Sequence, residues 1–227
     1  MASAISKKEI RRNPLAEWVG AAVRFVQTHR FAFVAAAMLV AIGVSGAAFY
    51  WYYQQRQEEE ASRILGNAFA AIRKEQPRAT GNSEDAAKLF QEVVKQFPKT
   101  GSAEEALIAL GNVQYEAGQI DEAAASFDQY LRILPRGRFT LQAGLGKAYA
   151  LEAKGDPQGA AQTLSEVLER NKQDPLAGEA YMSLARLYEI LKKPDDATRL
   201  YGQVVETYPQ TRWAQNALQR LTALKAN

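Results

Sequence analysis

The feature that most constrains the fold is an internal repeat. Four segments align without gaps, and each begins 37 residues after the previous one. They are EDAAKLFQEVVKQFP from Glu84, DEAAASFDQYLRILP from Asp121, QGAAQTLSEVLERNK from Gln158 and DDATRLYGQVVETYP from Asp195. A unit of this size cannot bury its apolar face alone, so the units are predicted to stack and share one continuous core.

The aligned columns are typical of helices that pack closely on a partner. One column contains only alanine, which lets two helices approach, and large residues follow on the same face. Proline ends the segment in three units, whereas Lys172 in the third unit makes its exit turn less predictable. The columns are Ala86, Ala123, Ala160 and Ala197; Phe90, Phe127, Leu164 and Tyr201; Val93, Tyr130, Val167 and Val204; and Pro98, Pro135 and Pro209.

A partner helix precedes each segment and carries a leucine followed by a small residue. These pairs are Leu65-Gly66, Leu110-Gly111, Leu145-Gly146 and Leu184-Ala185. The two helices resemble the hairpin of the tetratricopeptide-repeat (TPR) family, which implies an all-α solenoid of about four hairpins. The interval from the small residue to the helix end is 24 residues in the second and fourth units but 26 in the third, which predicts two extra residues around 153–156.

Both ends of the repeat array depart from the pattern. In the first unit, the polar stretch 76–83 contains Pro77, Gly81 and Asn82 and predicts an elongated loop between the two helices. The first helix of that unit is predicted to continue from the preceding apolar segment through 54–75. At the other end, Trp213 to Lys225 is predicted to form a helix that caps the stack.

An uncharged apolar run extends from Phe31 to Tyr53. As a helix it would be about 34 Å long, enough to cross the roughly 30 Å hydrocarbon core of a bilayer. Its last five residues, 49–53, are all aromatic, and aromatic rings favour the membrane interface. The sequence therefore predicts a transmembrane helix in contact with lipid over 31–53.

Charge predicts the orientation of this helix. Six Lys or Arg residues and two Glu precede it, whereas residues 54–60 contain one Arg and three Glu. By the positive-inside rule, the N-terminus is cytoplasmic and everything after Tyr53 is exported. A cleaved signal peptide is the alternative, because residues 45–48 are small; the long charged region and the long apolar run argue for an uncleaved anchor.

A second helical pattern lies before the anchor, with Asn13 as a possible N-cap and Pro14 at the first helical position. This helix could lie flat on the membrane surface or be a solvated lead-in, and the pattern leaves both open. Its apolar stripe comprises Leu15, Trp18, Val19, Ala22 and Val26.

The composition argues against catalysis and cofactors. There is no cysteine, and the single histidine, His29, has no second histidine to complete a triad or a metal site. No phosphate-binding loop is present, since Gly144-Leu145-Gly146 lies within a helical pattern. The carboxylates Glu104, Glu105, Asp121 and Glu122 stand at helix starts, where the helix dipole explains them. The small net charge of +3 comes from the basic N-terminal tail and is not a nucleic-acid footprint.

The TPR resemblance implies that proteins or peptides bind along a concave face built mostly from the first helix of each hairpin. By that resemblance the face comprises Ile108, Asn112, Tyr115, Ala143, Lys147, Met182, Arg186 and Glu189. A TPR subclass that grips a C-terminal carboxylate is disfavoured, because only Asn112 occupies a suitable position and the flanking cations are missing.

The whole chain resembles the YfgM family, ancillary subunits of the bacterial SecYEG translocon. That resemblance implies an inner-membrane protein with a periplasmic TPR domain, whose partners are the translocon and periplasmic chaperones. The repeats are also similar to TPR proteins of the Tol-Pal system and of the BAM complex, which implies envelope scaffolding as the alternative. The predicted parts are a basic tail (1–30), the anchor (31–53), a divergent first hairpin (54–101), three repeat units (102–210) and a capping helix (211–227).

Overall fold

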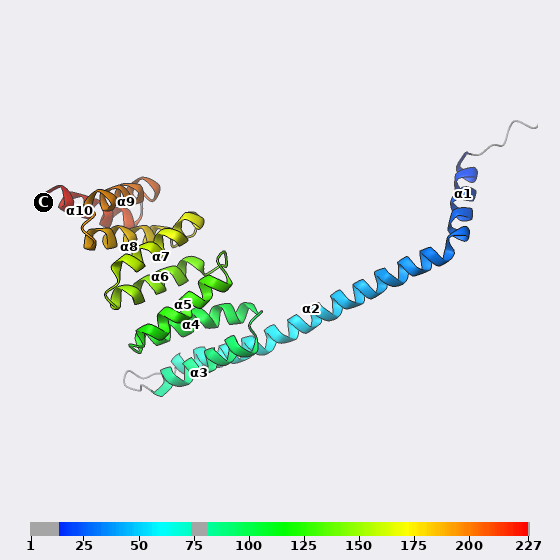
Figure 1. Ribbon diagram of the computed structural model, residues 1–227, viewed down its shortest axis with the longest axis horizontal. Coiled ribbons are helices and arrows are strands. Elements are labelled where there is room, and N and C mark those ends of the chain that lie inside the picture. The colour runs from blue at the N-terminus through cyan, green and yellow to red at the C-terminus, as the bar shows by residue number, and fades with distance from the viewer. Residues whose placement is uncertain (1–13, 74–80, 227) are drawn as a thin grey trace, which may run out of the picture. The chain divides into compact units, whose positions relative to one another are not determined.

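The computed structural model describes residues 14–73 and 81–226, and these form helices joined by short turns (Figure 1). The chain divides into two compact units, Met1–Gln55 and Arg56–Asn227. The predicted N-cap Asn13, the basic residues before it and most of the predicted loop at 76–83 lie outside the described residues.

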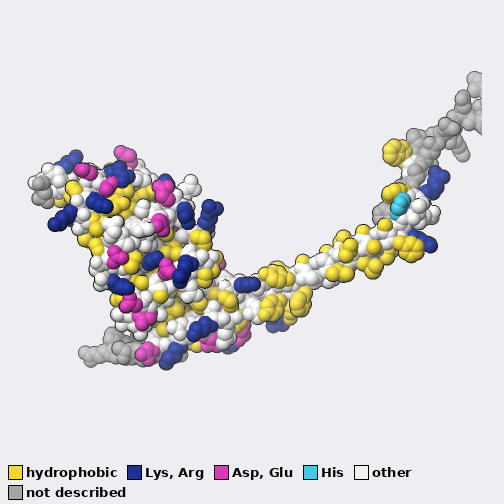
Figure 2. Space-filling view, viewed as in Figure 1, with side chains coloured by type: hydrophobic (Ala, Val, Ile, Leu, Met, Phe, Trp, Pro, Cys, Tyr) yellow, Lys and Arg dark blue, Asp and Glu magenta, His cyan; other side chains and the backbone are white. Residues whose placement is uncertain are grey.

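The N-terminal unit contains α1 (Pro14–Thr28) and the first part of α2 (Arg30–Arg73). Proline at the first position of α1 suits a helix start, because its missing N–H would have no partner there. α2 is one helix of 44 residues, long and apolar enough to cross a membrane, and its apolar window is not buried within the protein. Figure 2 shows hydrophobic side chains along this stretch. Trp18, Val19 and Val26 of α1 are also exposed, whereas the side chains of Leu15 and Ala22 lie outside the described set.

The second unit is a stack of antiparallel helices (Figure 1). The end of α2 pairs with α3, three hairpins follow, and α10 covers the last of them, which confirms the predicted all-α solenoid of four hairpins with a C-terminal helix. The helices are α3 (Gly81–Gln96), α4 (Gly101–Glu116), α5 (Ile120–Ile133), α6 (Thr140–Ala153), α7 (Pro157–Arg170), α8 (Ala177–Ile190), α9 (Pro194–Thr207) and α10 (Arg212–Ala226).

The turn within the third unit has the same length as its counterparts, so the prediction of two extra residues is wrong. Each turn occupies three residues, at 117–119, 154–156 and 191–193. Each has the same closing hydrogen bonds; Asp156 N, for example, donates to Leu151 O at 2.9 Å. The middle residue has positive φ in all three turns: Gly118 at 77°, Gly155 at 81° and Lys192 at 56°. The 37-residue period therefore runs through the first helices as well as the second.

This register explains the misleading Leu145-Gly146 motif. The true equivalents of Gly111 in the next two units are Ala148 and Ala185, each 37 residues further along. Gly146 instead leaves room for Phe127 of the preceding hairpin. A Cβ at Gly146 or at Gly111 would collide with the ring of Phe127. Phe127 of α5 thus lies between a glycine of α4 and a glycine of α6, and its side chain is 1% exposed.

Two other predicted irregularities are smaller than expected. α3 begins at Gly81, so residues 81–83 are the first turn of a helix and not part of a loop. α7 ends at Arg170, two residues before Lys172, as α5 and α9 end two residues before their prolines. In the third unit, which lacks the proline, Asn171 Nδ2 donates to Val167 O at 2.7 Å and so satisfies a carbonyl in the last turn of α7.

Glu58 of α2 fixes the start of α4. Its carboxylate accepts hydrogen bonds from Gly101 N at 2.7 Å, from Ser102 N at 3.0 Å and from Ser102 Oγ at 2.6 Å. Thr100 Oγ1 accepts from Ala103 N at 3.1 Å. The N-terminal amides that a helix cannot satisfy internally therefore have partners, and negative charge lies where the helix dipole favours it.

Candidate functional site: the concave face

The first helices of the hairpins line the inner face of the solenoid. α4 contacts α6, α6 contacts α8 and α8 contacts α10, whereas among the described helices the second helices α3, α5, α7 and α9 make no such neighbour contacts. The first helices therefore lie closer together, and their side of the stack is concave. The second helices spread apart on the convex side.

Side chains 37 residues apart form two rows across this face. One row holds Asn112, Tyr149 and Arg186, and the other holds Tyr115, Glu152 and Glu189. Because equivalent residues of neighbouring units lie side by side, each side chain can reach across to the next first helix.

Ion pairs join the rows at the C-terminal end of the face. Arg186 forms a bidentate pair with Glu152, with Nη2 donating to Oε2 at 2.6 Å. Glu189 accepts from Tyr201 Oη at 2.6 Å and pairs with Arg220 of α10. Each pair links α6 to α8 or α8 to α10, so the pairs also connect neighbouring units.

A hydroxyl completes this network. Tyr149 Oη donates to Glu179 Oε1 at 3.1 Å and lies 3.2 Å from Ser183 Oγ. Tyr149 therefore joins α6 to α8 one turn before the Glu152–Arg186 pair.

The pairing shifts the acid–base behaviour of these groups. The hydrogen bond from Arg186 lowers the pKa of Glu152. Burial raises the pKa of Glu189, but the hydrogen bonds from Arg220 and Tyr201 outweigh it, and the pKa is lowered overall. Burial, followed by the hydrogen bond to Glu189, raises the pKa of the Tyr201 hydroxyl. Both carboxylates are therefore held in the charged form, and their charges are already matched by arginines.

The α4 end of the face is open and uncharged. Asn112 is exposed, and the side chain of Tyr115 is 38% exposed. In the described part of the chain neither side chain has a hydrogen-bond partner. An amide and a phenol that lack internal partners can donate and accept bonds with a bound polypeptide.

The predicted face is only partly assembled by the structure. Four predicted residues lie in the two rows: Asn112, Tyr115, Arg186 and Glu189. Met182 lies on α8, as Arg186 and Glu189 do, and is half-buried. Ile108 is 4% exposed and belongs to the core.

Two predicted residues lie outside the face, because the predicted register of α6 is two residues off. Ala143 is 0% exposed, so it cannot contact a ligand. Lys147 is directed at α5, where its Nζ lies 2.7 Å from Asp128 Oδ1. In the 37-residue register their counterparts are Leu145, a core residue, and Tyr149, and Glu152 is a further row member that the prediction lacked; the strict 37-residue spacing is the signal that identifies Tyr149 and Glu152. Across residues 14–73 and 81–226, no group of three or more His, Asp or Glu side chains is arranged to hold a metal ion.

Two family models match the chain. Residues 24–133 match one described as a tetratricopeptide repeat-like domain, and residues 145–211 match one described as a tetratricopeptide repeat. The first match begins before the apolar segment and includes all of it.

Among curated proteins, the chain is similar to the outer membrane protein assembly factor BamD of two Xylella fastidiosa strains, 9a5c and Temecula1. The identity to each is 23% over 145 residues, which cover 64% of this chain and 43% of the relative. The matched region thus spans less than half the length of these relatives.

Solved structures share the fold. A tetratricopeptide repeat protein from Parabacteroides merdae has a TM-score of 0.60 at 17% identity, covering 74% of this chain and 61% of that one. MamA from Desulfovibrio magneticus RS-1 has 0.56 at 19%, covering 73% and 84%. PilF from Pseudomonas aeruginosa has 0.57 at 15%, covering 74% and 68%.

Proposed function

Because the chain belongs to the tetratricopeptide-repeat proteins, we propose that it is a non-catalytic scaffold that binds an extended segment of another protein on its concave face. The single observation that carries this proposal is the division of that face. Its charges toward α10 are matched internally, whereas Asn112 and Tyr115 on α4 are free to bind.

This division favours recognition of the peptide backbone over recognition of charge. A ligand that competed for Arg186 or Glu189 would have to replace an existing ion pair, so its own charge would gain little net pairing energy. At Asn112 nothing has to be broken, and one amide offers both a donor and an acceptor to a peptide group.

The scaffold is proposed to be anchored in the bacterial inner membrane by the apolar part of α2, with its N-terminus in the cytoplasm and the solenoid in the periplasm. The length and apolar character of α2 support the anchor. The excess of Lys and Arg before residue 31 supports the orientation.

Two settings fit such a scaffold. The order of basic tail, anchor and repeat solenoid supports an accessory role at the SecYEG translocon and its periplasmic chaperones. The similarity to the outer membrane protein assembly factor BamD supports a role in envelope assembly instead.

Affinity purification of the full-length protein from mildly solubilised membranes, with partners identified by mass spectrometry, tests both the function and the setting. We expect a partner that is lost when Asn112 and Tyr115 are both changed to alanine and retained in a Glu206→Gln control. Recovery of SecYEG and chaperones would support the first setting, and recovery of assembly factors the second. A partner set unaffected by the double variant would contradict binding at this face.

A further inference from the structure

We propose that a pocket on the convex side, between α5 and α7 over α6, binds an acidic side chain of a partner protein. The pocket has a volume of about 210 Å³. Its lining includes the cations Arg132, Lys147 and Arg170 and the carboxylates of Asp128 and Glu166. It lies on the opposite side from the concave face and is independent of the function proposed above.

Lys147 distinguishes this pocket from the equivalent positions in the neighbouring repeat units. The equivalent residues 37 positions before and after it are Leu110 and Leu184, which are 5% and 4% exposed core residues. The Lys147 side chain is 25% exposed and paired with Asp128, so the third unit lacks the apolar contacts that leucine makes at this position in its neighbours. The groove is therefore polar where the repeat itself requires an apolar residue.

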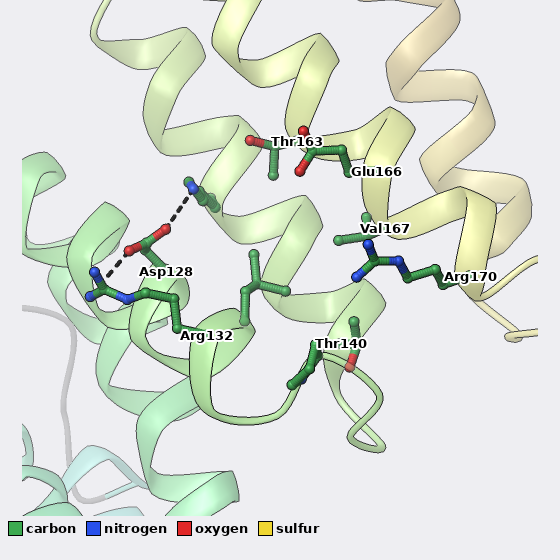
Figure 3. Close-up of a pocket in the computed structure, with 10 residues that line it drawn as sticks. Asp128, Arg132, Thr140, Thr163, Glu166, Val167 and Arg170 are labelled. Atoms are coloured by element: carbon green, nitrogen blue, oxygen red, sulfur yellow. Dashed lines mark hydrogen bonds and ion pairs between the residues drawn. The ribbon is translucent and has the colours of Figure 1, made fainter.

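The charges around Lys147 are not balanced. Asp128 pairs with Lys147 at 2.7 Å and also with Arg132 at 3.2 Å, so one carboxylate serves two cations (Figure 3). Glu166 on α7 accepts a hydrogen bond from the neutral Gln162 amide at 2.9 Å and so keeps its negative charge in the lining. The lining carries three cations and two carboxylates, so the pocket has an excess of one positive charge.

Two hydrogen-bond donors of α7, on Arg170 and Thr163, line the pocket and have no partner among the described residues. Arg170 makes no ion pair or hydrogen bond through its side chain with any described residue. The Thr163 hydroxyl has no partner among the described residues, and its oxygen is accessible although the residue as a whole is 8% exposed. Figure 3 shows Thr163 and Arg170 on one side of the pocket and Asp128 and Arg132 on the other. A carboxylate placed between them would balance the one excess positive charge of the lining and could accept a hydrogen bond from Arg170.

The size and the floor of the pocket favour a side chain over a small molecule. Pockets for cofactors and drug-sized ligands are typically about 300–1,000 Å³, so this one is too small for them. Leu131 and Val167 supply an apolar floor suited to the methylenes of a glutamate. The occupant we infer is therefore a glutamate-containing segment of a partner protein.

Fluorescence anisotropy tests this on the full-length protein in uncharged detergent micelles. The probes are a labelled Gly-Ser-rich peptide with three consecutive glutamates and its matched glutamine peptide. Arg170→Gln should weaken binding of the acidic peptide by about five- to tenfold, as expected for one charged hydrogen bond. Arg212→Gln, which removes the same charge from exposed α10, should leave it unchanged.

Lys147→Leu separates binding from folding. It installs the leucine of the sister units, so we expect Tm to rise by about 2–4 °C while the acidic peptide no longer binds. The proposal is overturned if the glutamine peptide binds equally well, if Arg212→Gln weakens binding as much as Arg170→Gln, or if Lys147→Leu still binds. Inorganic phosphate is titrated separately, and saturable phosphate binding without peptide binding would also overturn it.

Discussion

At the residue scale, the stack depends on a few places where a side chain enters a neighbouring helix. Phe127 is the clearest example, because two glycines on two different helices leave space for its ring. Gly146 belongs to α6 but is required by α5, the second helix of the preceding unit. Gly111 makes room for Phe127 within one hairpin, whereas Gly146 makes room for it between two hairpins.

Changing Gly146 to alanine should destabilise the solenoid by about 1–3 kcal/mol, because the new Cβ would collide with a buried ring that has nowhere to move. The matched control is Gly202→Ala in α9, where a Cβ meets nothing within 4 Å. That change should stabilise by up to about 1 kcal/mol through helix propensity. Urea unfolding of the two variants measures the difference, and equal stabilities would show that the register described here is wrong.

At the element scale, helices are joined by groups that one helix supplies to another. Glu58 on α2 caps α4, and Glu152 on α6 pairs with Arg186 on α8. Neither interaction lies within one hairpin, so these groups determine how hairpins stack.

Removing the Glu58 carboxylate should loosen the first turn of α4. We expect Glu58→Ala to cost about 1–2 kcal/mol, since three hydrogen bonds to that turn lose their acceptor. Glu58→Gln keeps one acceptor oxygen and should cost less. Hydrogen exchange at the Gly101 and Ser102 amides reports the effect locally, and unchanged protection in Glu58→Ala would refute the cap.

The Glu152–Arg186 pair should make stability depend on pH. Because the pKa of Glu152 in the folded protein lies below its ordinary value of 4.5, the pair contributes fully above that value and is lost as pH falls through the folded pKa. Arg186 is 43% exposed, so we expect only about 0.2–1 kcal/mol at neutral pH.

Melting curves of the wild type and of Glu152→Gln should therefore differ at pH 7, and the difference should shrink as the pH falls below 4.5 and through the folded pKa of Glu152. Glu206→Gln is the control, because Glu206 makes no ion pair in the described part of the chain. A gap between wild type and Glu152→Gln that stays constant from pH 7 to pH 3 would count against the pair.

At the scale of the whole molecule, the sequence predicts the helices correctly wherever the 37-residue repeat pattern is uninterrupted. The repeated segments predicted the starts of α5, α7 and α9 to within one residue, and each of these helices ends two residues before the last residue of its segment. The first helices have a less regular sequence pattern. In α6 the pair Leu145-Gly146 resembles Leu110-Gly111 but lies two residues before the true equivalent position.

Because of this two-residue offset, Lys147 and Ala143 were predicted on the concave face but do not lie there. A shift of two positions on a helix turns a side chain by about 200°, which is why Lys147 faces the convex side and Ala143 the core. The pairing of Glu152 with Arg186 and of Glu189 with Arg220 depends on how units stack, and spacing within one unit does not contain that information.

Site-specific photo-crosslinking shows whether a protein binds on the concave face. A photoreactive phenylalanine derivative is placed at residue 112 or 115 on the concave face, or at residue 206 on α9, in the full-length protein in cells. We expect protein adducts from 112 and 115 and none from 206. Adducts that form equally from 206, or that are missing from both 112 and 115, would contradict protein binding on the concave face.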